Sequence, residues 1–95
     1  MTEGHGERDW LFLTNHAHVL ICIAREPGIR MREIATKVGI TERAVQLIVR
    51  DLERGGYLSV ERVGRRNSYV VRSSAPMRHK LHEGHSIDDL VAVLR

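Results

Sequence analysis

Arginines are the residues of this sequence whose chemistry is most informative, because they bind phosphates and guanine edges. Residues 41–72 contain seven arginines and no lysine, against four acidic residues, which gives this segment a net charge of +3. The planar guanidinium donates paired hydrogen bonds to phosphate oxygens and to guanine edges. The pattern therefore indicates a nucleic-acid partner, while a merely solvated basic surface is the simpler interpretation of the same charges. The seven are Arg43, Arg50, Arg54, Arg62, Arg65, Arg66 and Arg72.

Histidines form a second group with possible metal chemistry. His79, His82 and His85 recur at every third position near the end of the chain. However, their proline- and glycine-flanked segment need not be helical, and His82-Glu83-Gly84-His85 is one residue short of the zinc-protease spacing. We therefore expect exposed linker histidines, with no metal site and no other cofactor.

The single cysteine and the other possible nucleophiles give little sign of catalysis. One cysteine excludes an internal disulfide framework and a cysteine-rich zinc site. Cys22 lies between two isoleucines, where a free cysteine usually behaves as a small hydrophobic residue; a redox switch is the alternative. The chain has no phosphate-binding glycine loop and no recognisable nucleophile motif. We therefore do not expect an enzyme.

Length and composition indicate one small globular domain. The chain has 95 residues, of which 42% are hydrophobic and 4% aromatic. Its longest apolar run, Val19–Ala24, is six residues long, against the roughly 20 that a membrane-spanning helix needs. The N-terminal residues do not resemble a secretory signal. These features predict a cytoplasmic protein that does not enter a membrane.

Three helices are expected in the first part of the chain. The first follows a cap at Thr14 or Asn15 and ends near Arg25, before Pro27-Gly28. The second covers residues 31–38, where apolar residues form one stripe and Gly39 follows in the position of a left-handed cap. The third runs from residue 42 to about residue 54 after a cap at Thr41. The first helix is apolar on all sides around Val19–Ala24, which predicts burial on more than one face.

A β-hairpin and a final helix are expected to follow. Residues 57–63 and 68–72 have strand patterns, and Gly64-Arg65-Arg66-Asn67 has the composition of a turn. A short strand near residues 28–30 is expected to join the hairpin. The final helix begins at Ser86, with Asp89 in a variant of the capping box. The predicted organisation is an arm (1–13), a central domain (14–72), and a linker with a C-terminal helix (73–95).

The helix pair has the spacing of a helix-turn-helix. Ala35 allows close approach of the helices, Gly39 takes the turn, and apolar residues clamp the pair at Ile34, Val38, Ile40, Val45 and Ile48. With the arginine-tipped hairpin, residues 14–72 resemble the winged helix-turn-helix of bacterial regulators, most closely the MarR-type and ArsR-type repressors. The resemblance implies a fold that is mainly α with a small antiparallel β-hairpin, and a transcriptional regulator that binds double-stranded DNA sequence-specifically.

The resemblance also implies roles for individual residues. The helix at 42–54 would enter the major groove, with Arg43 suited to guanine, Gln46 to adenine and Leu47 to a thymine methyl group. The hairpin would be a wing, whose tip (64–67) meets the minor groove or the phosphates beside it. Arg30, Arg32 and Lys37 would contact the backbone. The expected DNA-binding residues are Thr41, Glu42, Arg43, Gln46, Leu47, Arg50, Arg65, Arg66, Asn67 and Arg32. Thr41 and the charged residues also suit simple caps and surface pairs.

A homodimer is the expected assembly. Two features favour it: the all-round apolar first helix, and the apolar stripe of the last helix at Ile87, Leu90, Val91 and Leu94. That stripe can pair with a second copy or fold back on its own core. Two other functions stay open. One is a winged-helix module that binds a protein instead of DNA, and the other is a repressor gated by a metal or a small ligand.

Overall fold

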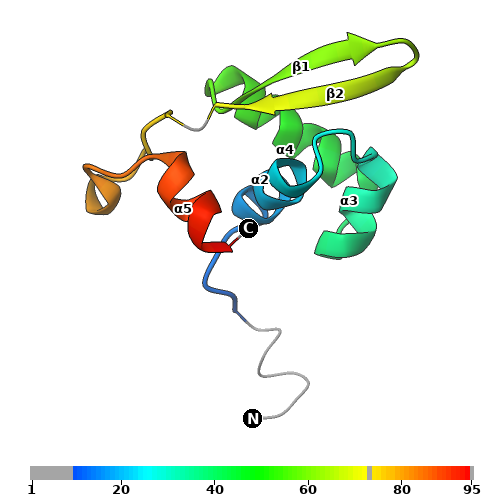
Figure 1. Ribbon diagram of the computed structural model, residues 1–95. Coiled ribbons are helices and arrows are strands. Elements are labelled where there is room, and N and C mark those ends of the chain that lie inside the picture. Colours follow the sequence, from blue (N-terminus) through cyan, green and yellow to red (C-terminus); the bar gives the residue numbers. More distant parts are fainter. Residues whose placement is uncertain (1–9, 73, 95) are drawn as a thin grey trace.

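The structure is a computed structural model that describes residues 10–72 and 74–94. It confirms a mainly α fold with one antiparallel hairpin (Figure 1). In chain order, the elements are α2 (Asn15–Arg25), α3 (Met31–Val38), α4 (Glu42–Arg54), β1 (Leu58–Val63), β2 (Arg66–Val71), the short 3-10 helix η1 (Lys80–His82) and α5 (Ile87–Leu94).

The helix ends form where the sequence predicts them. The hydroxyl oxygen of Thr14 accepts a hydrogen bond from the Ala17 amide at 3.3 Å, and that of Thr41 accepts one from the Ala44 amide at 3.0 Å. Each hydroxyl thereby satisfies one of the unpaired amides of a first helical turn. Gly39 has φ 87° and ends α3, since a left-handed residue there lets the Gly39 and Ile40 amides both reach the Ala35 carbonyl.

Helix α2 lies at the centre of the domain. It packs against α3, α4, β2 and α5, and Val19, Leu20, Ile21 and Ile23 are all buried. The prediction of burial on more than one face is therefore confirmed. The neighbours belong to the same chain, so the apolar surface of this helix does not require a second copy.

The hairpin differs from its prediction in two details. The strands pair from Leu58 with Val71 to Val63 with Arg66, which leaves Gly64-Arg65 as a two-residue turn. Arg66 and Asn67 were expected in the turn, but they belong to β2. The expected strand at residues 28–30 is absent, because the described sheet has two strands only. In its place, the Tyr69 amide donates one hydrogen bond to the Pro27 carbonyl at 3.0 Å.

The last helix folds back on the domain. Helix α5 packs against α2, and Ile87 and Val91 are buried in the common core. The chain leading to α5 is held by the Ile87 amide, which donates to the Ala75 carbonyl at 2.9 Å. Of the four residues expected at a dimer interface, Ile87 and Val91 thus face the chain's own core, because α2 offers them an apolar surface. Leu90 and Leu94 are half-buried.

One half of the capping variant predicted at the start of α5 is present. The Ser86 amide donates to Asp89 Oδ2 at 3.2 Å, and His85 Nδ1 lies 2.9 Å from the same oxygen. The hydrogen bond with His85, and then that from the Ser86 amide, lower the pKa of Asp89. The carboxylate form is therefore favoured at the end of the helix where its charge is stabilising. In residues 10–72 and 74–94, no helix has the length and apolar character needed to cross a membrane.

Candidate nucleic-acid interface

Helix α4 has two contrasting sides. Val45, Ile48, Val49 and Leu52 are buried in the core. The other side is exposed to solvent and contains every residue that was expected to read bases: Glu42, Arg43, Gln46, Leu47 and Arg50. Leu47 is 43% exposed although the core is close by. The helix thus presents a polar surface with one apolar side chain, which can contact base edges and a thymine methyl group.

The N-terminal end of α4 is held by its cap and by the α3–α4 turn. Thr41 is exposed, and its oxygen accepts from the Ala44 amide, so the hydroxyl proton is still available to a second acceptor. Helix α3 packs against both α2 and α4. Its exposed Arg32 and Lys37 can reach acceptors outside the protein.

The arginines of this surface form no ion pair with a carboxylate of the described residues. In the described part of the chain, the two side-chain contacts of basic groups with carboxylates within 4 Å involve histidines: His16 with Asp51, and His85 with Asp89, each at 2.9 Å. Surface pairs were the other expectation for these charges, but the described residues show neither an Arg50–Glu53 nor an Arg54–Asp51 pair. Asp51 is instead held by His16, so the arginines of α4 keep their donors for another partner.

The wing extends toward the side of the domain where α3 lies (Figure 1). Arg66 Nη2 donates to the Gly28 carbonyl at 2.9 Å and thereby ties the outer end of the hairpin to the α2–α3 loop. Arg65 lies in the turn itself and is exposed. A cavity of 390 Å³ brings Arg65 and Arg66 next to Arg30 and Met31 at the start of α3. The wing arginines and the start of α3 therefore form one cationic region.

Asn67 is exposed on β2, two residues before Tyr69. Burial raises the pKa of Tyr69, a hydrogen bond with Asn67 opposes that rise, and the charge of Glu53 adds to it. Tyr69 is buried at the base of the wing. Asn67, like Arg65, is open to solvent.

The remaining sequence candidates lie outside this surface. In the segment with His79, His82 and His85, one 3-10 turn forms at Lys80–His82, and the described residues contain no group of three possible metal ligands. Cys22 is half-buried on α2. Burial raises the pKa of its thiol, and the charges of Lys37 and Arg25 only partly offset that rise. A raised pKa disfavours the reactive thiolate.

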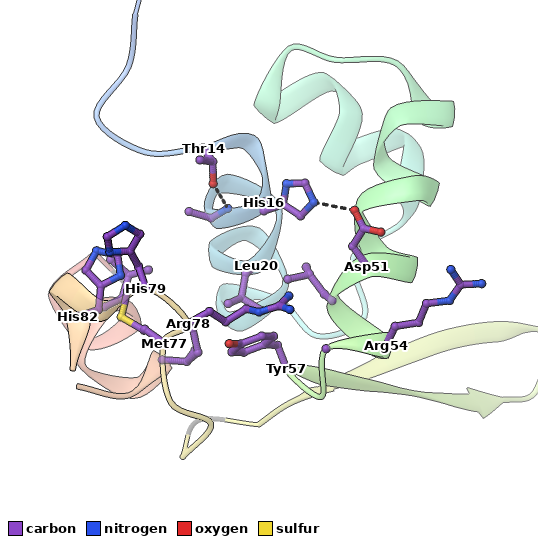
Figure 2. Close-up of a pocket in the computed structure, with 15 residues that line it drawn as sticks. Thr14, His16, Leu20, Asp51, Arg54, Tyr57, Met77, Arg78, His79 and His82 are labelled. Carbon is purple, nitrogen blue, oxygen red and sulfur yellow. Dashed lines mark hydrogen bonds and ion pairs between the residues drawn. The ribbon is translucent and has the colours of Figure 1, made fainter. Parts of the chain in front are cut away.

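One feature had no signal in the sequence. A groove of 610 Å³ separates the start of α2 and the end of α4 from the segment that leads to α5 (Figure 2). Its residues come from four distant parts of the chain, among them His16, Asp51, Tyr57 and Arg78. The Tyr57 hydroxyl donates to the Pro76 carbonyl at 2.8 Å and holds the two sides together. No local pattern predicts such a groove, because it arises from long-range packing.

Comparison with known proteins agrees with this geometry. Residues 14–59 match the family model described as winged helix-turn-helix DNA-binding. These residues are similar to winged helix-turn-helix DNA-binding domains, and the chain has the winged-helix fold. The matched segment contains the three helices and the start of β1, and the structure adds β2 to complete the wing. The resemblance inferred from the sequence is confirmed.

A solved structure shares the arrangement. The PcaV transcriptional regulator from Streptomyces coelicolor, a MarR-family protein solved in complex with its natural ligand, is 27% identical with a TM-score of 0.54. The alignment covers 62% of this chain and 44% of that one, so the chain spans less than half the length of that regulator. No curated protein matches the chain significantly.

Proposed function

We propose that this protein is a transcriptional regulator that binds double-stranded DNA sequence-specifically through its winged helix-turn-helix. In this proposal, α4 lies in the major groove and the wing lies at the minor groove or on the phosphates beside it. Thr41, Glu42, Arg43, Gln46, Leu47 and Arg50 form the major-groove contact set. Arg65, Arg66, Asn67 and Arg32 contact the DNA backbone or the minor groove.

The observation that carries the proposal is the exposed side of α4. It combines hydrogen-bonding side chains with one exposed leucine, and its arginines have no carboxylate partner in the described residues. Base edges offer both hydrogen-bonding groups and a methyl group in the major groove, and therefore complement such a mixed surface. The cationic region formed by the wing and the start of α3 would hold the flanking phosphates.

The proposed assembly is a homodimer that binds a near-palindromic site. A two-fold dimer places its recognition helices in successive turns of the major groove, about 34–36 Å apart. The half-buried Leu90 and Leu94 of α5 are the members of the expected interface that a second copy can still reach.

Selection from random duplex DNA at two salt concentrations tests the proposal. A palindromic motif with affinity that falls steeply as salt rises would support it, since each neutralised phosphate contributes roughly −0.9 to the slope of log affinity against log salt. Salt-dependent binding without a motif would replace it with an architectural role. Absence of binding at low salt would favour the alternative, a winged helix that binds a protein partner.

A further inference from the structure

The groove beside α5 has an apolar floor and a polar rim. It lies between the start of α2, the end of α4 and residues 77–90 (Figure 2). Its floor is built from Leu20, Leu52, Tyr57, Met77 and Leu90. A volume of 610 Å³ is large enough for one or two aromatic side chains.

The rim of the groove is cationic. Arg54 and Arg78 line it, together with His79 and His82. Asp51 is the one acidic residue among its lining, so with neutral histidines the lining keeps a net charge of +1. The groove therefore suits an occupant with an apolar body and a negative charge.

The segment before α2 is an exposed apolar cluster. Trp10, Leu11 and Phe12 are 65%, 61% and 91% exposed, and the two aromatic rings pack edge to face with centroids 5.0 Å apart. Contiguous apolar surface of this kind marks an interaction site. In the sequence, three acidic residues and one arginine precede the cluster, so residues 1–9 carry a net charge of −2. This cluster and its charge match the groove.

We propose that residues Trp10–Phe12 of one copy dock into the groove of a second copy, and that the exchange is reciprocal. The chain leads away from the domain where it precedes α2, so the cluster does not lie in its own groove (Figure 1). The pairing gives each copy one arm to offer and one groove to fill. These are the requirements of a two-fold symmetric dimer.

The area involved suits a stable dimer. An aromatic side chain buries about 150–250 Å². Two arms with two aromatic rings each bury roughly 600–1,000 Å², and with the groove surface that they cover the total reaches the roughly 1,000 Å² that a specific interface needs. Aromatic residues seated in pockets also contribute most of the binding energy in such interfaces.

This inference rests on the homodimer in the proposed function and is independent of DNA binding. Its test contains no DNA. If the protein dimerises through its arms but binds no duplex DNA, only the proposed regulator function is refuted. If it binds DNA and its dimer is unaffected by loss of the arm residues, only the arm exchange is refuted.

The first experiment is sedimentation equilibrium of the full chain over a range of concentrations. The wild type is expected to be a dimer. Trp10→Ala with Phe12→Ala should raise the dimer dissociation constant by about a hundredfold or more, because both anchors are lost. Leu90→Glu should have a similar effect, since it places a negative charge in the groove that receives an acidic arm. Circular dichroism and thermal melting check that each variant is folded.

Val93→Glu is the matched control. Val93 is also on α5 and is 81% exposed, but it does not line the groove. This variant should dimerise like the wild type. A wild-type chain that stays monomeric, a dimer that survives loss of Trp10 and Phe12, or equal effects of Leu90→Glu and Val93→Glu would each overturn the proposal.

A mixing experiment tests exchange between copies directly. Trp10 is the only tryptophan in the chain. The Leu90→Glu variant keeps its arm, while the variant without Trp10 and Phe12 keeps its groove and has no tryptophan. Titrating the second into the first should shift the Trp10 emission to shorter wavelength and protect it from quenchers. An emission that does not change at any concentration would contradict docking in trans.

Discussion

At the scale of single residues, the side chains on the exposed side of α4 fall into two groups. Some suit base edges, and the others suit either bases or the phosphate backbone. Gln46 and Leu47 are side chains that meet base edges if the helix lies in the major groove, whereas the arginines can contact either bases or phosphates. On the wing, Arg65 and Arg66 differ although they are neighbours. Arg65 is exposed in the turn, and Arg66 is hydrogen-bonded to the Gly28 carbonyl. The two wing arginines therefore have different surroundings, and we expect different effects when each is replaced.

Replacing Gln46 should change sequence preference. Gln46→Ala is expected to weaken binding by about 1–3 kcal/mol at one base pair and to relax the preference there, because a paired hydrogen bond to adenine is lost. Competition between operator variants measures this effect. Glu53→Ala, an exposed change at the other end of α4, is the control. Equal weakening on all sequences would show that Gln46 does not read a base.

Replacing the wing arginines should give effects that do not add. Arg65→Ala is expected to lower the salt slope by about 0.9, as one lost phosphate contact does. Arg66→Ala also removes the link to Gly28 and so frees the hairpin that presents Arg65. The double variant should therefore lose less affinity than the sum of the two single changes. Strictly additive losses in a fluorescence-anisotropy titration would mean that Arg66 contacts DNA independently of wing position.

At the scale of elements, the α3–α4 turn sets the direction of α4, the proposed recognition helix. Gly39 adopts φ 87°, and an added Cβ would have no atom within 4 Å. Any penalty for a side chain there comes from the backbone conformation and not from crowding. The turn thus sets the angle between α3 and α4, and with it the direction that the exposed side of α4 faces.

Gly39→Ala is expected to destabilise the domain by about 1–2 kcal/mol, the usual penalty for a left-handed residue with a Cβ. Urea unfolding followed by circular dichroism measures the change. Gly28→Ala is the control, because that glycine also has free space around it and does not have a positive φ. Similar losses for both glycines would contradict a specific requirement at position 39.

At the scale of the whole molecule, the proposed function requires two copies in a fixed relation. Helix α2 is surrounded by elements of its own chain, and α5 packs on it. A dimer must therefore use surfaces that the folded chain leaves exposed, and the segment Trp10–Phe12 is the most apolar of these. The spacing of the two recognition helices then sets the spacing of the half-sites.

Inserting five base pairs between the two half-sites should abolish cooperative binding. The insertion rotates one half-site by about half a turn, so the rigid dimer can reach only one of them. Affinity should fall to that of a single half-site in a gel-shift titration. A central substitution that keeps the spacing should have little effect. Unchanged affinity after the insertion would indicate two independently bound monomers.

The sequence by itself determined the local elements of this protein. The apolar stripes and the caps at Thr14 and Thr41 predicted the helices, and Gly39 predicted the turn, because these signals act between residues a few positions apart. The same reasoning predicted which residues of α4 are exposed. It also identified the winged helix-turn-helix, since that motif is a fixed succession of local elements.

Only the tertiary structure decided how distant segments meet. The stripe of α5 suited either a second copy or its own core, and packing against α2 placed Ile87 and Val91 in that core. The hairpin composition did not reveal that Arg66 reaches Gly28, or that Gly64-Arg65 alone form the turn. The groove also joins residues up to 76 positions apart, from Thr14 to Leu90. Such contacts depend on the free energy of packing the whole chain, which no local pattern contains.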